Sequence, residues 1–211
     1  MNIYIELEDE RFVHLSGLLS HRFTIVDDIK DAEIVVLGIH KTEFVKEIKN
    51  KYVFSFCPMD GCINLSENED YLKKNAYLTA LGCLSTLKDN YENIVIYGNG
   101  RIANYLNELL SYKAVLLARH PKEGEYMLDD LIYQKADLII NTIPARLPID
   151  ITLLKNDVKI IDLASYPYGF NHEALKSQGI DISLLSGIPG RMYPKTAACI
   201  IYQEVMKCLK D

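Results

Sequence analysis

The chain has 211 residues, of which 49% are hydrophobic and 25% are charged. This composition is typical of a folded enzyme and excludes disordered and fibrous classes, and the length allows one large core or two modest ones. A net charge of -6 argues against a broad nucleic-acid surface, because backbone phosphates are bound by a concentrated basic face.

The sequence predicts a cytoplasmic protein that holds no metal. The segment MNIYIELEDE is acidic where a secretory signal is basic, and no apolar run approaches the length that crosses a membrane. The five cysteines are scattered and odd in number, which suits a reducing compartment. Cys57 and Cys62 lack a second pair of ligands at the spacing that structural zinc requires.

Residues 1–70 alternate short apolar runs with helical patterns, which predicts a small α/β lobe. The expected strands are Asn2–Leu7, Ile34–Leu37 and Val53–Phe56, and the expected helices are Arg11–Ser20 and Thr42–Lys49. Apolar residues at near-helical spacing between Asp70 and Leu87 predict a connecting helix within residues 71–90.

Residues 91–211 contain nearly continuous runs of Val, Ile and Leu, as strands covered on both faces require. The expected strands are Asn93–Tyr97, Lys113–Ala118, Leu138–Thr142, Lys159–Leu163 and Asp181–Leu185. Short helices fit between most of them, and an apolar stripe over Thr196–Leu209 predicts a closing helix. The predicted fold class is therefore α/β, with a Rossmann-like doubly wound parallel sheet preceded by a smaller α/β lobe.

A glycine-rich turn follows the first strand of this second region. The residues are Gly98, Asn99, Gly100, Arg101, Ile102 and Ala103, which form a G-x-G-x-x-A pattern that leads into a helix. Gly98 supplies a tight turn, Gly100 lets the backbone approach a pyrophosphate, and Ala103 allows close helix packing. The pattern predicts a dinucleotide site, and the alternative is a bare connection between strand and helix.

The next strand ends in Arg119 and His120, about twenty residues beyond the first glycine, where an NAD enzyme carries Asp or Glu. A planar guanidinium matches the 2′-phosphate of NADP, which an acidic side chain would repel. We therefore expect NADP as the cofactor. The alternative is a solvated arginine at a strand end.

Three later segments place polar or small residues at strand ends, where open α/β sheets hold their ligands. The first is Asn141, Thr142, Ile143 and Pro144, which we expect beside the nicotinamide ribose unless they form a simple strand exit. The second is D-L-A-S-x-P-x-G over residues 162–169, and the third is G-x-P-G-x-x-x-P-K-T-A over residues 187–197.

Together with the glycine turn, this ordered series resembles the A subunit of dipicolinate synthase. The resemblance covers residue 91 to the C-terminus and extends weakly to Thr79, Ala80, Leu81 and Gly82. It implies NADP-dependent oxidation of a dihydrodipicolinate-type heterocycle, a small dicarboxylate from lysine biosynthesis, to dipicolinate, which accumulates in spores during sporulation. It also implies a partner, the flavoprotein-like B subunit, and a homo-oligomer is a further expectation.

The resemblance and the strand positions nominate further site residues. Lys195, Asp162 and Ser165 are the catalytic candidates, and the substrate-binding candidates are Ser165, Arg191, Lys195, Thr196 and Thr79. Asp162 is alternatively a cap of the following helix, and Thr196 is alternatively the N-cap of the last one. None of the five histidines makes a recognisable acid–base pair in the sequence.

Some residues depart from the family pattern. Leu81 stands where the family carries a glutamate, the first lobe looks shorter, and Arg191 and Tyr193 bring bulk and charge into a more apolar loop. Two alternatives therefore stay open. One is a non-catalytic NADP(H)-binding subunit, and the other is an oxidoreductase for another small acid, similar to shikimate dehydrogenases.

Overall fold

The computed structural model describes residues 1–40, 48, 51–88 and 90–209. The chain divides into two compact units. The first unit comprises Met1–Leu78 and Pro189–Asp211, and the second comprises Thr79–Ile188. The helix expected over Thr42–Lys49 lies outside the described residues, apart from Ile48.

The first unit contains a five-stranded parallel sheet in the order β2-β1-β3-β4-β5. This is the 2-1-3-4-5 order of flavodoxin-like doubly wound folds. The predicted strands are confirmed, although the short outer strands β2 and β5 were not foreseen. The bounds are β1 Asn2–Ile5, β2 Thr24–Ile25, β3 Ile34–Val36, β4 Tyr52–Ser55 and β5 Ile63–Asn64, with helix α1 at Glu10–Leu19.

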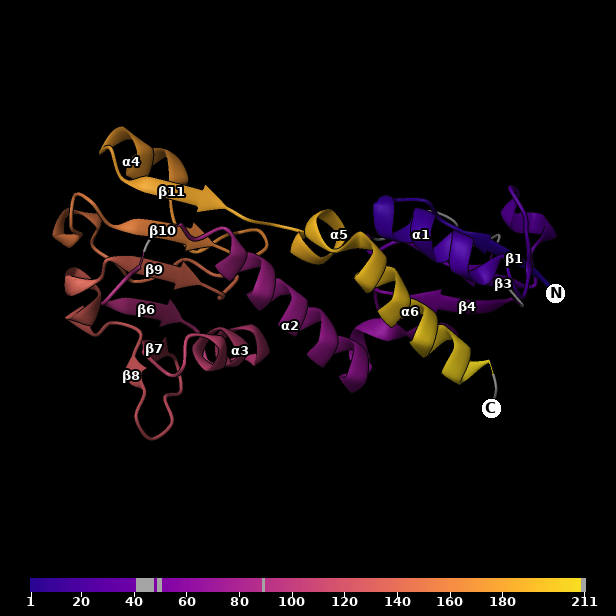
Figure 1. The fold of residues 1–211 in the computed structure, drawn as a ribbon, viewed down its shortest axis with the longest axis horizontal. Helices are drawn as coiled ribbons and strands as arrows, with labels where there is room; N and C mark the ends of the chain where they lie inside the picture. The colour runs from indigo at the N-terminus through magenta and orange to yellow at the C-terminus, as the bar shows by residue number, and fades with distance from the viewer. Residues whose placement is uncertain (41–47, 49–50, 89, 210–211) are drawn as a thin grey trace. The chain divides into compact units, whose positions relative to one another are not determined.

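Helix α6, Pro194–Cys208, packs into the first unit, and Figure 1 shows it beside α1. Its buried Ile201 and Val205 share one core cluster with Phe12 and Leu15 of α1. The boundary therefore differs from the domain of residues 91–211 that the sequence predicted. The apolar stripe over Thr196–Leu209 predicted an amphipathic helix, but such a stripe does not indicate which of the two sheets the helix covers.

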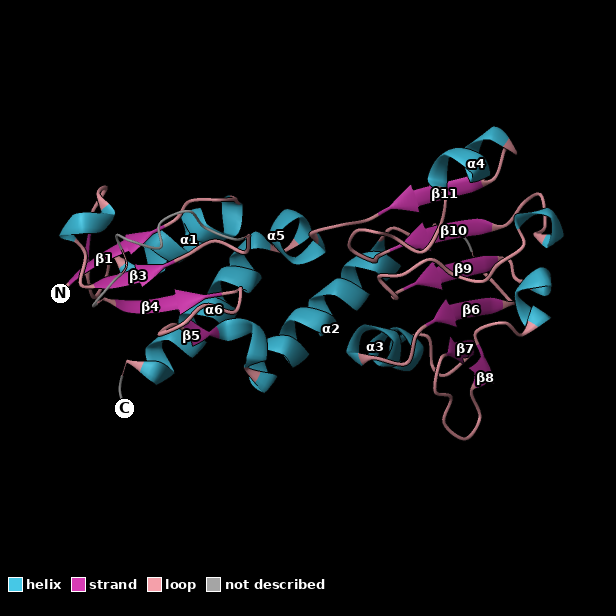
Figure 2. Ribbon diagram, turned by 180° about the vertical axis from the view of Figure 1, so that it is seen from behind, coloured by secondary structure: helices cyan, strands magenta, loops and turns pink. Residues whose placement is uncertain are grey.

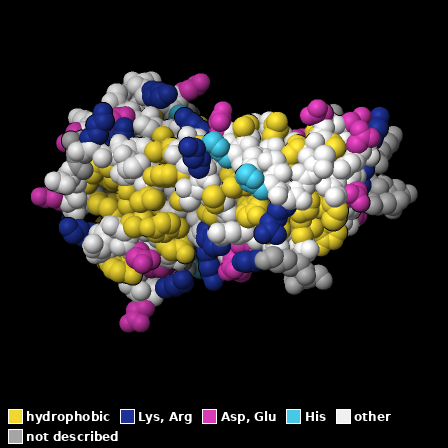
Figure 3. Space-filling model, turned by 45° about the vertical axis from the view of Figure 1, so that its right-hand side comes forward, with side chains coloured by type: hydrophobic (Ala, Val, Ile, Leu, Met, Phe, Trp, Pro, Cys, Tyr) yellow, Lys and Arg dark blue, Asp and Glu magenta, His cyan; other side chains and the backbone are white. Residues whose placement is uncertain are grey.

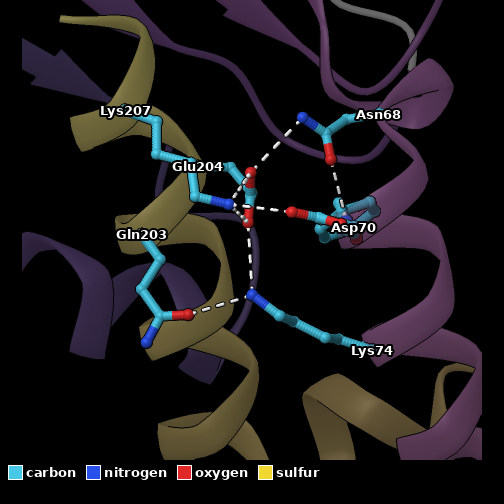
Figure 4. Close-up of polar contacts among 7 residues, drawn as sticks. Asn68, Asp70, Lys74, Gln203, Glu204 and Lys207 are labelled. Carbon is cyan, nitrogen blue, oxygen red and sulfur yellow. Dashed lines mark hydrogen bonds and ion pairs between the residues drawn. The ribbon is translucent and has the colours of Figure 1, made fainter. Parts of the chain in front are cut away.

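A cluster of charged and amide side chains joins the start of α2, Glu69–Ser85, to α6 (Figure 4). Glu204 is buried, and its carboxylate accepts from Lys207 Nζ at 3.0 Å and from Lys74 Nζ at 3.3 Å. Lys207 also bonds Asp70, and these bonds raise the pKa of Lys207 while lowering that of Asp70. Because the buried carboxylate of Glu204 is paired with two lysines, the cluster links α2 to α6 without leaving a buried charge uncompensated.

The second unit contains a six-stranded parallel sheet in the order β11-β10-β9-β6-β7-β8 (Figure 2). Counted from β6 along the chain, this is the Rossmann order 3-2-1-4-5-6 seen from the other edge. The predicted fold class is therefore confirmed. The bounds are β6 Ile94–Tyr97, β7 Ala114–Ala118, β8 Tyr126–Met127, β9 Leu138–Asn141, β10 Lys159–Asp162 and β11 Asp181–Leu184.

The connections of this sheet are less helical than the sequence suggested. Helix α3, Arg101–Leu109, follows β6, and helix α4, His172–Ser177, follows β10. The other connections between these strands contain only the 3₁₀ turns Leu131–Lys135 and Ile151–Leu153, within the described residues. Asp130 and Asp150 cap these turns, and such local side-chain bonds stabilise short turns as well as helix starts.

The surface carries mixed charge. On the face drawn in Figure 3, hydrophobic side chains form patches, and lysines and arginines are interspersed with acidic residues. The described helices include none that is long and apolar enough to cross a membrane.

Candidate functional site

The glycine turn lies where the winding direction of the second sheet reverses. Strand β6 has β7 on one side and β9 on the other, so the connections on its two sides run in opposite directions. Open α/β sheets bind ligands at the carboxyl ends of such strands. The turn after β6 therefore occupies the position where this fold forms a crevice.

Gly98 is required at this turn by its backbone and by its neighbours. Its φ is +118°, and a Cβ there would lie 2.2 Å from Thr142 Oγ1. That hydroxyl donates to the carbonyl of Tyr97 at 2.8 Å, so it is held in place. Only glycine fits this turn without displacing the exit of β9.

Gly100 leaves the start of α3 open. It is the N-cap of α3, no side chain caps the helix there, and a Cβ at Gly100 would meet nothing within 4 Å. The first amides of a helix lack intrahelical partners and attract anions, aided by the helix dipole. This geometry fits the pyrophosphate of a dinucleotide.

A pocket of about 540 Å³ opens at this edge of the sheet, within the range of small-molecule sites. Three segments expected to bind the cofactor meet there: the glycine turn, the exit of β7 and the exit of β9. Arg101, Ile102 and Asn141, also expected at the cofactor, do not line it. The lining residues are Gly98, Asn99, Gly100, Ala118, Arg119, His120, Thr142, Ile143, Pro144 and Ala145.

Glu125 is a residue of this region that the sequence did not reveal. Its carboxylate accepts from Asn99 Nδ2 at 2.9 Å and from the backbone amide of Lys122 at 2.9 Å. Asn99 also donates to the carbonyl of His120 at 3.0 Å. Asn99 of the glycine turn is thus hydrogen-bonded to the loop that begins at Arg119. No fixed spacing in the sequence predicts these hydrogen bonds.

Asn141 holds in place the segment after β9 that lines the pocket. It is 0% exposed, and its Nδ2 donates to Asp162 Oδ1 at 2.8 Å and to the carbonyl of Ile143 at 3.0 Å. Its Oδ1 accepts from the amide of Ile143 at 2.9 Å. The side chain therefore shapes the exit of β9, in place of the direct contact with a ribose that the sequence suggested.

Asp162 is also turned inward, which argues against direct contact with a substrate. It is 0% exposed, and both carboxylate oxygens accept hydrogen bonds. The donors are Asn141 Nδ2, the amides of Ala164, Gly169 and Phe170, and His172 Nε2 at 2.9 Å. Asp162 therefore holds the loop after β10 and orients His172, so the sequence was wrong to leave every histidine unpaired.

The remaining site candidates are not among the residues that line this pocket. Ser165 is exposed in the loop after β10, and Thr79 is 9% exposed in α2 at the start of the second unit. Arg191, Lys195 and Thr196 are exposed and belong to the first unit. The N-cap of α6 is Tyr193 and Pro194 begins the helix, so the alternative reading of Thr196 as the N-cap was wrong.

Part of the third motif has a packing role. Gly190 lies in helix α5, Ile188–Met192, and a Cβ there would lie 2.4 Å from Arg11 Nη2 and 2.7 Å from Asp9 Oδ2. Arg11 is buried and forms an ion pair with Asp9 at 2.7 Å. Glycine at 190 therefore lets α5 pack against a partly buried ion pair.

Comparison with known proteins gives no matching family model. The A subunit of dipicolinate synthase from Bacillus subtilis (strain 168) is 38% identical over 77 residues, which is 36% of this chain but only 26% of that protein. The crystal structure of the A subunit of dipicolinate synthase from Bacillus halodurans superposes with a TM-score of 0.79 at 19% identity, covering 100% of this chain and 98% of the other.

A wider likeness extends to dehydrogenase folds. The NAD-dependent formate dehydrogenase of Staphylococcus aureus, solved in complex with NAD, gives a TM-score of 0.56 at 14% identity and covers 100% of this chain and 95% of the other. At such identities the likeness concerns the fold alone. The resemblance that the motifs predicted is confirmed: in one stretch of sequence and in its whole fold, this chain is similar to the A subunit of dipicolinate synthase.

Proposed function

We propose that the second unit binds NADP(H) and that the chain oxidises a dihydrodipicolinate-type heterocycle to dipicolinate. The observation that carries the proposal is the pocket in which the glycine turn, Arg119 and the exit of β9 come together. The bound cofactor would supply the hydride acceptor. The substrate ring would lose a hydride to the cofactor and a proton to a base, so that two electrons leave the heterocycle.

Different residues of the pocket would bind different parts of the cofactor. The open backbone at Gly98 and Gly100 and the amides of α3 suit the pyrophosphate. Arg119, exposed at the end of β7, suits the 2′-phosphate of the adenosine ribose. Thr142, Ile143 and Pro144 line the pocket at the exit of β9, where the nicotinamide ribose would lie.

The substrate side of the proposal keeps the residues that the sequence nominated. Ser165, Thr79, Arg191, Lys195 and Thr196 remain the candidates for holding a small dicarboxylate, and Lys195 remains the candidate for the ring proton. Asp162 would act by positioning the loop that carries Ser165. A partner in the form of a flavoprotein-like B subunit, a homo-oligomer and a cytoplasmic location also belong to this proposal.

The test is cofactor selection by the full chain. We expect NADPH fluorescence to be quenched or blue-shifted at lower protein concentration than that of NADH. Arg119→Glu should weaken NADPH binding by about 10- to 100-fold, because a charge-assisted contact worth about 1.5–3 kcal/mol is replaced by repulsion. Lys113→Glu, an exposed charge change just before the start of β7, is the matched control and should leave binding unchanged.

Equal affinity of the unmodified chain for both cofactors would overturn the NADP assignment. The same preparations, supplied with dihydrodipicolinate and NADP, address the reaction itself. Reduction of NADP, with or without a B-subunit partner, supports the enzyme. NADPH binding without turnover in either condition favours the non-catalytic alternative, which is motivated by Leu81 in place of the family's glutamate.

A further inference from the structure

An aromatic surface projects from the loop after β10. Tyr166 is 82% exposed, and its ring meets that of Tyr168 edge-on, with centroids 5.8 Å apart and planes at 86°. Tyr168 in turn lies against the imidazole of His172, with centroids 5.4 Å apart and planes at 32°. The three rings form a connected series, which we call the aromatic ladder, and its outermost ring faces solvent.

The loop that carries the ladder is firmly held. The buried carboxylate of Asp162 accepts from the amides of Gly169 at 3.0 Å and Phe170 at 3.4 Å. Tyr168 has a φ of +63°, a left-handed conformation that a bulky residue adopts rarely and that persists only where the surroundings enforce it. Such conformations concentrate at functional sites. The exposed ring of Tyr166 is therefore presented by an ordered loop.

This loop lies directly beside the segment that forms one wall of the cofactor pocket. Strands β9 and β10 pair with Asn141 opposite Asp162, and the two side chains are hydrogen-bonded. Beyond the strands, the amide of Leu147 donates to the carbonyl of Gly169 at 3.0 Å. Because Thr142–Ala145 line the pocket, the loop that carries the aromatic ladder lies next to a pocket-lining segment at the carboxyl edge of the sheet.

Within the motif D-L-A-S-x-P-x-G, some residues hold the loop in place and others are exposed on it. Asp162 holds the loop, Ala164 is buried, and Gly169 has no room for a side chain, because a Cβ there would lie 2.2 Å from Asn141 Nδ2. The two variable positions of D-L-A-S-x-P-x-G are Tyr166 and Tyr168. Ser165, Tyr166 and Pro167 are exposed and Tyr168 is half-buried, so the loop presents the Tyr166 ring to solvent on a supported backbone.

We propose that Tyr166, supported by Tyr168 and His172, is the surface on which the planar ring of dipicolinate, the product of the proposed oxidation, stacks, which makes Tyr166 a specificity-determining residue. The inference rests on the proposed function. A pyridine ring that carries two carboxylates is poor in electrons, and the face of a tyrosine ring is negative, so offset stacking between them is favourable. Ser165, the neighbouring exposed residue, offers a hydroxyl to one of the carboxylates.

The experiment compares two ring dicarboxylates of the same charge, one planar and aromatic and one saturated. Calorimetric titration of the full chain, with and without saturating NADPH, uses dipicolinate and cis-cyclohexane-1,3-dicarboxylate. We expect the unmodified chain to prefer dipicolinate. Tyr166→Ala should weaken dipicolinate binding about fivefold and leave the saturated ligand unaffected, whereas Tyr166→Phe should retain the preference. Tyr112→Ala removes another exposed ring of the second unit, 72% exposed, and should change neither affinity.

Binding of NADPH by the same preparations separates this inference from the proposed function. If NADPH does not bind the unmodified chain, the proposed function fails. If NADPH binds but the chain does not discriminate between the two rings, or Tyr166→Ala leaves dipicolinate affinity unchanged, the stacking inference is overturned. Loss of NADPH affinity alone in Tyr166→Ala would mean that Tyr166 contacts the nicotinamide ring, and it too would overturn the assignment of Tyr166 to the dipicolinate ring.

Discussion

Two glycines in the turn after β6 have different physical roles, and substitution separates them. Gly98→Ala places a side chain at φ +118° against Thr142 Oγ1, which should cost about 1–3 kcal/mol of folding free energy. Gly100→Ala meets no neighbour and should cost at most about 1 kcal/mol, since alanine is a poorer N-cap than glycine. Its methyl group would nevertheless occupy the approach of the pyrophosphate, so NADPH binding should fall in both variants.

Thermal unfolding and NADPH titration of the two variants measure these effects independently. The decisive comparison is a near-normal stability with lost binding in Gly100→Ala. Normal NADPH affinity in Gly100→Ala would show that the backbone there does not approach the cofactor.

At the residue scale, the sequence predicted the parts of the site that depend on fixed spacing. That Gly98, Gly100 and Arg119 would lie close together was foreseen, because turn geometry and strand length place them, and their contact with a cofactor stays a prediction. Glu125 and His172 were missed because their partners, Asn99 and Asp162, are fixed by tertiary contacts alone. A polar residue that ends a strand can face the ligand or the neighbouring strand, and the sequence does not distinguish these directions.

At the element scale, the longer strands were foreseen because continuous runs of Val, Ile and Leu mark strands buried on both faces. Strands β2, β5 and β8 have two residues each, too few to show any periodicity. The 3₁₀ connections depend on capping by single aspartates, which the sequence also permits at the start of a longer helix.

Asp137 forms hydrogen bonds that link the starts of three parallel strands, β6, β9 and β10. The stability of the second unit should therefore depend on pH. Its carboxylate accepts from the amide and side chain of Asn93, before β6, and from Lys155, before β10. The bond from Lys155, followed by those from Asn93, lowers the pKa of Asp137 from its ordinary value of 3.8. Since the folded state has the lower pKa, the stabilisation is complete above about pH 4 and disappears as the pH falls further.

Denaturant unfolding of the unmodified chain and of Asp137→Asn between pH 7 and pH 3 tests this expectation. The variant should be less stable at pH 7, and the difference in unfolding free energy should narrow toward pH 3, because the Asp137 carboxyl of the unfolded chain then takes up a proton that the folded chain, with its lower pKa, binds less. A difference that stays constant over this range would assign the stabilisation to packing or neutral hydrogen bonds.

At the scale of the whole molecule, the first unit is built from two separate stretches of chain. Ile201 of α6 is 1% exposed within the core of β1, β3 and α1. Ile201→Ala should therefore destabilise this core by about 2–5 kcal/mol and accelerate amide exchange in residues 2–36, far away along the chain. Ile161→Ala, equally buried in β10 of the second unit, is the matched substitution and should accelerate exchange in residues 94–184. Faster exchange near β10 and unchanged exchange in β1 for Ile201→Ala would contradict the assignment of α6 to the first unit.

The return of the chain to its first unit at Pro189 bears on how the protein is made. Ribosomes release chains from the N-terminus, and domains generally fold as units in the order of their emergence. Here the second unit, Thr79–Ile188, leaves the ribosome completely before helix α6, which the first unit needs for its core. The second unit should accordingly be the first to complete its fold during translation, and the first unit should be the last.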